Sequence, residues 1–379
     1  METNRFETFF DAIIAIIITV LVLKIPQPLA PTFEAVLHLQ PIYMAYLITF
    51  LILYNIWYSN HNLFYIIDNI DNKSLSFYGM MTFTISLLPY FTIWLANNVY
   101  SVPAETIFGL IFIITHILNT LAIRSVRRSN PYNEKLKEMD HRILNIPVIF
   151  LLLGFLITYT VYVPGIFYCC LISVLLWIIL GRQNRPMTMK TERFEALIDA
   201  ILAIIITIIV LEIPLASGGG WNSLYELRYE FIIYAVSFVV CFNFWNYNNN
   251  IFSLVNRVNN KVIWTMGINL FIFSLLPYLT TFIAENFYVF FPQLLYGLLF
   301  IAISVLSKIT SVFLRQSDPG NIALQLVLGK NYNIITVTTV EVIGIIIGYL
   351  FYPPAITFCC LFSIVIIWII PKLEHIFSR

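Results

Sequence analysis

Apolar runs of about 20 residues, separated by short polar segments, follow one another along the whole chain. A helix of this length crosses the hydrocarbon layer of a bilayer. Proline lies at or near many of the junctions, where helices usually end. The pattern predicts twelve membrane-spanning helices, at residues 8–25, 41–60, 75–96, 104–123, 143–162, 164–181, 196–213, 229–250, 262–283, 292–314, 332–351 and 353–371.

The amino-acid composition agrees with this pattern. Of the 379 residues, 60% are hydrophobic and only 11% are charged, whereas a soluble domain carries roughly 25% charged residues. The apolar runs are continuous, unlike the alternating segments of about 10 residues that form a membrane β-barrel. We therefore expect an all-α polytopic membrane protein surrounded by lipid. A net charge of +1 gives no reason to expect a nucleic-acid partner.

The first apolar run has a close copy in the second half of the chain. Residues 5–26 read RFETFFDAIIAIIITVLVLKIP, and residues 193–214 read RFEALIDAILAIIITIIVLEIP. The same offset of 188 residues (193 minus 5) relates Trp57 to Trp245 and further segments beyond them. We predict two six-helix repeats, residues 1–185 and 186–379. Because six is an even number, both repeats enter the membrane from the same side and are parallel.

Basic residues give the orientation of the chain. If both termini are cytoplasmic, all lysines and arginines except Lys24 and Arg228 fall on the inner side of the membrane. Cytoplasmic loops of membrane proteins carry such an excess of positive charge. We therefore expect a multi-pass protein with cytoplasmic N- and C-termini.

Polar residues gather at the start of the first helix of each repeat. Glu7 and Asp11 are four residues apart and share a helical face, as Glu195 and Asp199 do. Carboxylates this close to the membrane require donors nearby. The candidate donors are Arg5, Arg193 and residues at the inner end of the second helix of each repeat, namely Trp57, Asn60, His61 and Asn62, and Trp245, Asn248, Asn249 and Asn250. This rim network either ties the first helix to the second or takes part directly in conduction.

An apolar stripe continues along the same helices. Its members recur at positions i, i+3, i+4 and i+7, which is one helical face: Ile16, Thr19, Val20 and Leu23 in the first repeat, and Ile204, Thr207, Ile208 and Leu211 in the second. A packing face or a lipid face would have this pattern too. The close similarity of the two copies favours equivalent places around a shared axis, where a ring of isoleucines forms a hydrophobic constriction.

The sequence contains no arrangement typical of an enzyme or a metal site. No cluster of His, Cys or carboxylate residues has the spacing of metal ligands, so we expect no cofactor and no catalytic residues. The pairs Cys169-Cys170 and Cys359-Cys360 lie in apolar runs and are interpreted as small packing residues. Glu341 lies deep in an apolar run, where it is either a proton site or the partner of a polar group on a neighbouring helix.

At these residues the sequence resembles the transmembrane protein 175 family of endosomal and lysosomal potassium channels and their prokaryotic relatives. The first helix of that family carries Arg-x-x-x-Phe-Ser-Asp before an apolar run. Arg5, Phe9 and Asp11 match this motif, and Phe10 replaces the serine. Arg193 and Asp199 match it in the second repeat, with Leu197 and Ile198 in place of Phe and Ser.

The second helix of the family has a tryptophan followed by a pair of histidines. Trp57 and His61 fit this motif, with Asn60 at the first histidine position. In the second repeat Trp245 is kept, but asparagines replace both histidines. The resemblance covers both repeats and is most specific in the first helix of each.

The resemblance implies a potassium-permeable cation channel without a pore loop, lined by the first and seventh helices. Members with one repeat assemble as tetramers and members with two assemble as dimers, so it implies a homodimer. The narrowest point of the family corresponds to Ile16 and Ile204, with Thr19 and Thr207 nearby. Potassium is the permeant ion, some members also pass protons, and a prokaryotic member would lie in the plasma membrane.

Two other functions fit parts of the pattern. Twelve helices in two parallel halves are also the layout of major-facilitator secondary transporters. The basic Gly-Arg loop of that class is missing, since the corresponding segment holds only Lys73, and charged residues in the middle of the membrane are rare. A membrane scaffold without transport activity is the remaining alternative.

Overall fold

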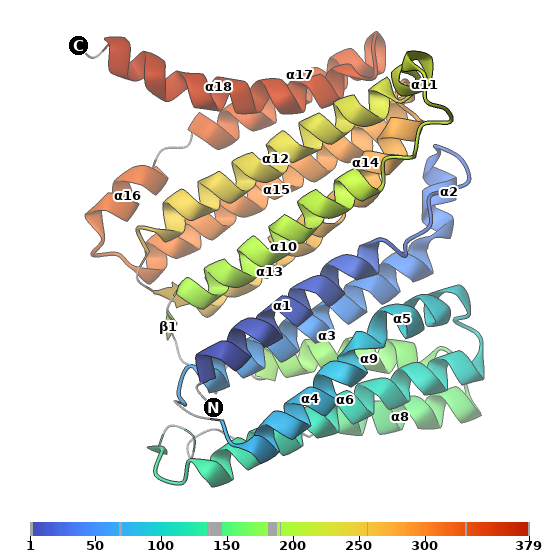
Figure 1. Ribbon diagram of the computed structural model, residues 1–379, viewed down its shortest axis with the longest axis vertical. Coiled ribbons are helices and arrows are strands. Elements are labelled where there is room, and N and C mark those ends of the chain that lie inside the picture. Colours follow the sequence, from blue (N-terminus) through green and yellow to red (C-terminus); the bar gives the residue numbers. More distant parts are fainter. Residues whose placement is uncertain are drawn as a thin grey trace. The chain divides into compact units, whose positions relative to one another are not determined.

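The chain is almost entirely helical and divides into two compact units. The computed structural model describes residues 3–67, 70–134, 136, 146–180, 188–189, 191–255, 257–329 and 332–377 (Figure 1). One unit comprises Met1–Ile25 and Leu39–Met187, and the other comprises Pro26–His38 and Thr188–Arg379. The predicted repeat boundary between residues 185 and 186 lies outside the described residues and stays a prediction.

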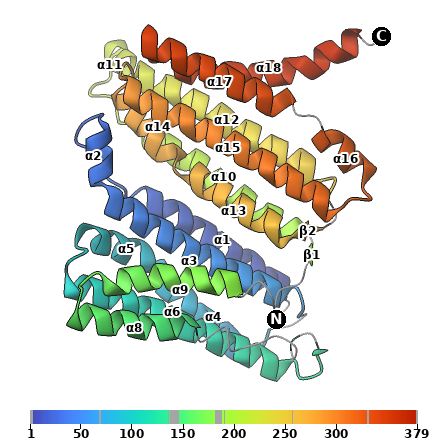
Figure 2. The same cartoon turned by 180° about the vertical axis from the view of Figure 1, so that it is seen from behind.

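The first unit is a bundle closed by a helical hairpin. Helix α1 packs on α3, α4 and α5, and α8 and α9 form a hairpin that packs on α6 (Figures 1 and 2). The helices of this unit are α1 (Thr3–Val22), α3 (Gln40–Phe64), α4 (Asn72–Ser86), α5 (Leu88–Asn97), α6 (Val102–Ser129), α8 (Ile146–Thr160) and α9 (Gly165–Leu180).

The second unit repeats this order of helices. Helix α10 packs on α12, α13 and α14, and α17 and α18 form a hairpin that packs on α15. Its elements are α2 (Phe33–His38), β1 (Thr188–Met189), α10 (Glu192–Leu211), α11 (Trp221–Glu226), α12 (Arg228–Phe252), β2 (Val258–Asn259), α13 (Asn260–Ser274), α14 (Leu276–Glu285), α15 (Phe290–Ser317), α16 (Ile322–Gly329), α17 (Tyr332–Leu350) and α18 (Ala355–Phe377). The two short strands pair antiparallel.

Residues Pro26–His38 follow α1 in the chain but belong to the second unit. The Gln27 side chain donates a hydrogen bond to the Tyr278 carbonyl oxygen at 3.2 Å. The Phe33 ring meets Phe291 edge to face, with 6.3 Å between the centroids. The sequence repeat and the compact unit therefore differ in this segment.

A break divides the third predicted helix of each repeat. Helix α4 ends at Ser86 and α5 begins at Leu88, with Pro89 in its first turn. Helices α13 and α14 are separated in the same way, with Pro277 at the matching place. Proline has no N–H group to donate to the preceding turn and its ring clashes with that turn. The sequence analysis predicted one helix at each place, and proline explains the difference.

Eight helical segments are long and apolar enough to cross a membrane. This supports the prediction of an all-α polytopic membrane protein. Helices α8, α9 and α18 have shorter apolar parts within the described residues, and α1 carries charged residues near its start. Each of the twelve predicted ranges overlaps a helix, while the number of crossings stays a prediction.

A side chain of the fourth long helix of each unit reaches the start of the last one. The Glu105 carboxyl of α6 accepts a hydrogen bond from the Phe167 backbone N–H in the first turn of α9, at 2.8 Å. In the second unit Gln293 of α15 accepts a hydrogen bond from the Thr357 hydroxyl of α18, at 2.5 Å. Glu105 is thus a helix cap, since it satisfies an N–H group that has no partner within α9.

Glycines bring the helices of each hairpin close together. A Cβ atom added to Gly154 would lie 2.9 Å from the Cβ atom of Cys169, and one added to Gly344 would lie 2.7 Å from the Cβ atom of Cys359. Real side chains do not approach this closely. All five cysteines are free, which agrees with their interpretation as small packing residues.

We predict opposite effects of two Gly→Ala substitutions in helix interiors. Gly344→Ala lowers stability by about 1–3 kcal/mol, because the added methyl group overlaps Cys359. Gly79→Ala raises it by about 0.5–1 kcal/mol, because alanine favours the helix and no atom lies within 4 Å of the new Cβ atom. Thermal unfolding of both variants in the same detergent measures the difference. Equal shifts would contradict the close packing of α17 on α18.

Candidate functional site

The start of α1 is held by a tryptophan of α3. The Trp57 indole nitrogen Nε1 donates a hydrogen bond to Asp11 Oδ1 at 2.9 Å. Both side chains are buried, with 0% of Trp57 and 5% of Asp11 exposed. The His61 ring, one turn further along α3, stacks on Trp57 at 5.0 Å between centroids and an angle of 17°. Three of the predicted rim residues are therefore in contact.

The second unit repeats the central bond in a more open setting. Trp245 Nε1 donates to Asp199 Oδ1, again at 2.9 Å. Asp199 is exposed and Trp245 is half-buried, in contrast to their counterparts. Asn249, which corresponds to His61, is exposed as well. The two units therefore share one hydrogen bond but differ in how much water can reach it.

The two predicted arginine donors lie at the edge of this arrangement. Arg5 is exposed, and within the described part of the chain its side chain makes no hydrogen bond or ion pair. Arg193 is half-buried at the matching place of α10. A role for either arginine in the rim network stays a prediction.

A second buried polar cluster of the first unit was only partly visible in the sequence. The Asn60 amide of α3 donates to Asn119 Oδ1 of α6 at 2.9 Å and accepts from the Tyr78 hydroxyl of α4 at 2.8 Å. Asn60 was named as a candidate donor for the carboxylates, but Asn119 and Tyr78 were missed. Their counterparts Met266 and Ser307 do not preserve the pattern, so the repeat gave no signal for them.

The residue that replaces the family's serine packs in the core. Phe10 is completely buried, and its ring meets Phe64 and Tyr78 edge to face at 6.1 Å. Ile198 occupies the same place in the second unit and is 1% exposed. Both substitutions thus exchange a hydroxyl group for apolar packing, and neither touches the Asp–Trp bond.

The stripe of α1 is only partly exposed. Ile16 is 48% exposed and Leu23 is 37% exposed, whereas Val20 is half-buried. Thr19 is buried, and its hydroxyl group donates to the carbonyl oxygens of Ala15 and Ile16 at 2.9 Å.

The stripe of α10 differs in detail. Leu211 and Thr207 are exposed and Ile204 is half-buried, while Ile208 is buried. The Thr207 hydroxyl donates to the Ile204 carbonyl oxygen at 2.8 Å. The face is therefore apolar in both units, but the threonine points to the surface in only one of them.

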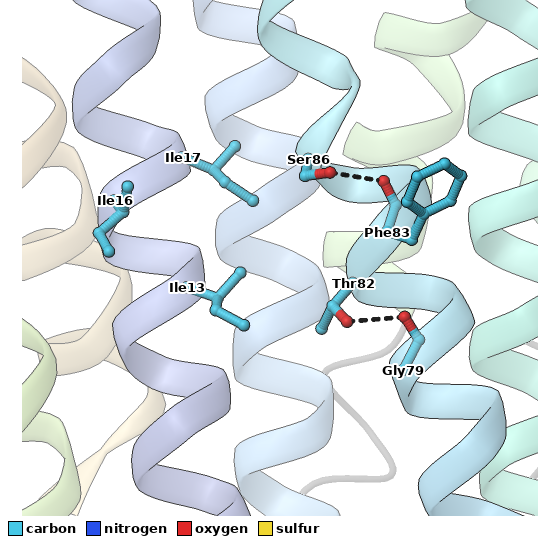
Figure 3. Close-up of a pocket in the computed structure, with 7 residues that line it drawn as sticks. All are labelled: Ile13, Ile16, Ile17, Gly79, Thr82, Phe83 and Ser86. Atoms are coloured by element: carbon cyan, nitrogen blue, oxygen red, sulfur yellow. Dashed lines mark hydrogen bonds between the residues drawn. The ribbon is translucent and has the colours of Figure 1, made fainter.

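An open groove of about 400 Å³ lies between α1 and α4 (Figure 3). Ile13 and Ile17 point from α1 toward α4, and Ile16 lies apart from them (Figure 3). The hydroxyl groups of Thr82 and Ser86 bond to carbonyl oxygens of their own helix at 2.8 and 2.7 Å. Their donors are thereby satisfied, so the groove is apolar in character.

Comparisons with known proteins agree with the sequence motifs. The model of the family described as endosomal/lysosomal potassium channel TMEM175 matches residues 5–89 and 193–277. Across the described residues, no group of three or more His, Cys, Asp or Glu side chains could hold a metal ion.

Three bacterial relatives are each described as a potassium channel. The protein of Chryseobacterium sp. is 30% identical over 183 residues, which are 48% of this chain and 94% of the relative. That of Chamaesiphon minutus is 30% identical over 130 residues, 32% of this chain and 64% of the relative. That of Streptomyces collinus is 32% identical over 100 residues, 25% of this chain and 48% of the relative.

Proposed function

Since the chain belongs to the endosomal/lysosomal potassium channel TMEM175 family, we propose that it is a potassium-permeable leak channel. In this proposal two copies form a homodimer around a central pore lined by α1 and α10. Ile16 and Ile204 close the pore, and protons are the second candidate permeant ion. All twelve predicted helices cross the membrane, which is the plasma membrane in a prokaryote, and both termini are cytoplasmic.

The observation that carries the proposal is the repeated Asp–Trp hydrogen bond. The same pair of atoms lies 2.9 Å apart in both units. The stripe begins five residues after the aspartate in each helix, at Ile16 and Ile204, which is about 7.5 Å along the axis. Two helices fixed at equivalent points present their isoleucines at the same height, as a shared pore requires.

The exposure of the stripe supports assembly around these helices. Ile16, Leu23 and Leu211 are apolar and exposed in the single chain, so a second copy or lipid has to cover them. The placement of Thr19 and Ile208 in the pore wall rests on the helical stripe alone, because both are buried in the single chain.

The length of one relative supports a dimer. The match to the Chryseobacterium protein takes up nearly all of that relative but only about half of this chain, so the relative is about as long as one repeat. Two copies of this chain supply four repeats. They would place four isoleucines around the axis, two Ile16 and two Ile204, and a narrow ring of isoleucines limits ion flow by excluding water.

Ion flux into liposomes tests the proposed function. Purified chain reconstituted at low density is expected to carry a potassium flux that rises with the gradient and needs no counter-substrate. Sodium and proton flux, measured with the same vesicles, give the selectivity. A saturable flux that requires a second substrate would instead favour a secondary transporter, and no flux from a correctly folded dimer would contradict channel activity.

A further inference from the structure

Glu341 lies in α17 and has none of its surface exposed. Neither carboxyl oxygen has a hydrogen-bond partner of normal geometry within the described part of the chain. The Cys360 thiol next to it is a weak donor. Glu105, the other deeply buried carboxyl considered above, differs because it caps α9. Glu341 therefore has no comparable structural partner.

The groups that face this carboxyl come from the two helices packed against α17. A Cβ atom added to Gly297 of α15 would lie 3.6 Å from Glu341 Oε2. The titratable groups in electrostatic contact with it are Tyr296 of α15 and Cys359 and Cys360 of α18. None of them carries a positive charge, so an ionised Glu341 would have no counter-ion among the described residues.

A chain of buried hydroxyl groups leads toward this place. The Thr280 hydroxyl of α14 lies 2.8 Å from that of Ser237 in α12, and the Tyr296 hydroxyl lies 3.1 Å from Ser237. Ser237 is completely buried, Tyr296 is 1% exposed and Thr280 is 5% exposed. The core of the second unit thus contains a continuous polar path from α14 to the surroundings of Glu341.

The first unit has the beginning of this path but not its end. Thr49 and Thr92 form the matching hydroxyl pair at 2.8 Å. Phe108 stands where the second unit has Tyr296. Leu151 stands in the place of Glu341, at the offset of 190 residues that relates the Cys-Cys pairs (359 minus 169). Both side chains are buried. The fold therefore does not require a polar group at either place, and the second unit has two such groups together.

We propose that Glu341 is a proton-binding site of the second unit, whose occupancy controls the packing of the α17–α18 hairpin on α15. An unpaired carboxylate in an apolar interior is very costly, so the folded chain holds the neutral acid. Loss of the proton places a charge between α15, α17 and α18, and water or separation of the helices then has to solvate it. The proposal is independent of potassium permeation.

Infrared spectroscopy of the full chain in lipid tests the protonation state directly. The wild type at neutral pH is expected to show the carbonyl band of a protonated carboxylic acid, and Glu341→Gln is expected to lose part of that band. Glu105→Gln is the matched control, because it removes the other deeply buried carboxyl and leaves the Glu341 contribution in place. A spectrum without this band, or a band that Glu341→Gln leaves unchanged, would overturn the proposal.

The dependence of unfolding on pH tests the link to packing. An unfolded glutamate releases its proton near pH 4.3, roughly, whereas the folded chain keeps it. The folded chain then binds more protons than the unfolded chain, so stability falls as the pH rises. Each pH unit in this window lowers the folding equilibrium constant about tenfold. Apparent melting temperatures should therefore fall by several degrees between about pH 4 and pH 8 in the wild type.

Two variants decide the origin of this loss. Glu341→Gln is expected to lose less stability than the wild type over the same range. If that variant fails to fold, the pair Glu341→Leu and Tyr296→Phe recreates Leu151 and Phe108 of the first unit and provides the same comparison. Profiles parallel to that of the wild type would show that Glu341 does not couple proton binding to packing.

Discussion

Replacing Ile16 and Ile204 together with asparagine should raise potassium flux roughly tenfold, which corresponds to a barrier lower by ~1.4 kcal/mol. The isoleucine side chains offer no hydrogen bonds, so a narrow ring of them excludes water and opposes the entry of a hydrated ion. Asparagine is smaller and its amide group binds water. The same change should therefore weaken the preference for potassium over sodium.

Single variants and a surface control define this test. Ile16→Asn and Ile204→Asn should each have a smaller effect than the double variant, because half of the proposed ring stays apolar. Val210→Asn is the control, since Val210 is exposed on α10 but lies off the stripe. Fluorescence-based flux into liposomes, normalised to the amount of folded protein, measures all four. An unchanged flux in the double variant would place the constriction elsewhere.

Trp57→Phe and Trp245→Phe should differ strongly although the two tryptophans make the same bond. Trp57→Phe should lower the free energy of unfolding by about 1–3 kcal/mol, because the buried Asp11 loses a donor that water cannot easily replace. Trp245→Phe should cost less than about 1 kcal/mol, because water can reach the exposed Asp199. Unfolding of the purified variants in one detergent gives both values.

A double-mutant cycle separates the hydrogen bond from the loss of ring volume. Asp11→Asn combined with Trp57→Phe gives the coupling in the first unit, and Asp199→Asn combined with Trp245→Phe gives it in the second. The first coupling energy should be the larger. Equal values would mean that solvent exposure does not decide the strength of the bond. Potassium flux of the same variants shows whether the rim network also contributes to conduction.

The sequence could predict the contacts that depend on one helix pair and recur in both repeats. Asp11 and Trp57 lie at matching places in two neighbouring helices, and their copies Asp199 and Trp245 keep the same offset. Two independent occurrences of one pair indicate a contact. The structure places both pairs at hydrogen-bond distance.

Contacts that involve a third helix could not be predicted in this way. The bond of Asn60 to Asn119 depends on how closely α6 approaches α3, and helical periodicity gives the face of a helix but not its neighbours. The cap that Glu105 provides for α9 depends on the direction of a helix 60 residues further along the chain. The proline breaks were visible as residues, but only the backbone shows that each helix stops and starts again.

Exposure along the stripe also escaped the sequence. Thr19 and Thr207 occupy identical positions in nearly identical helices, yet the first is buried and the second is exposed. The environment of each helix decides this difference, and no pattern within the helix encodes it. Site residues inferred from the repeat alone are therefore equivalent in register but not in surroundings.

The segment Pro26–His38 limits how freely the two halves of this gene can be treated as modules. Its residues are encoded with the first repeat, but Gln27 and Phe33 bind to Tyr278 and Phe291 of the second. A chimera that exchanged the first repeat for that of a relative would remove this cover from the second half. Duplication produced two copies, and the later divergence of this loop has made one of them a permanent part of the other's wall.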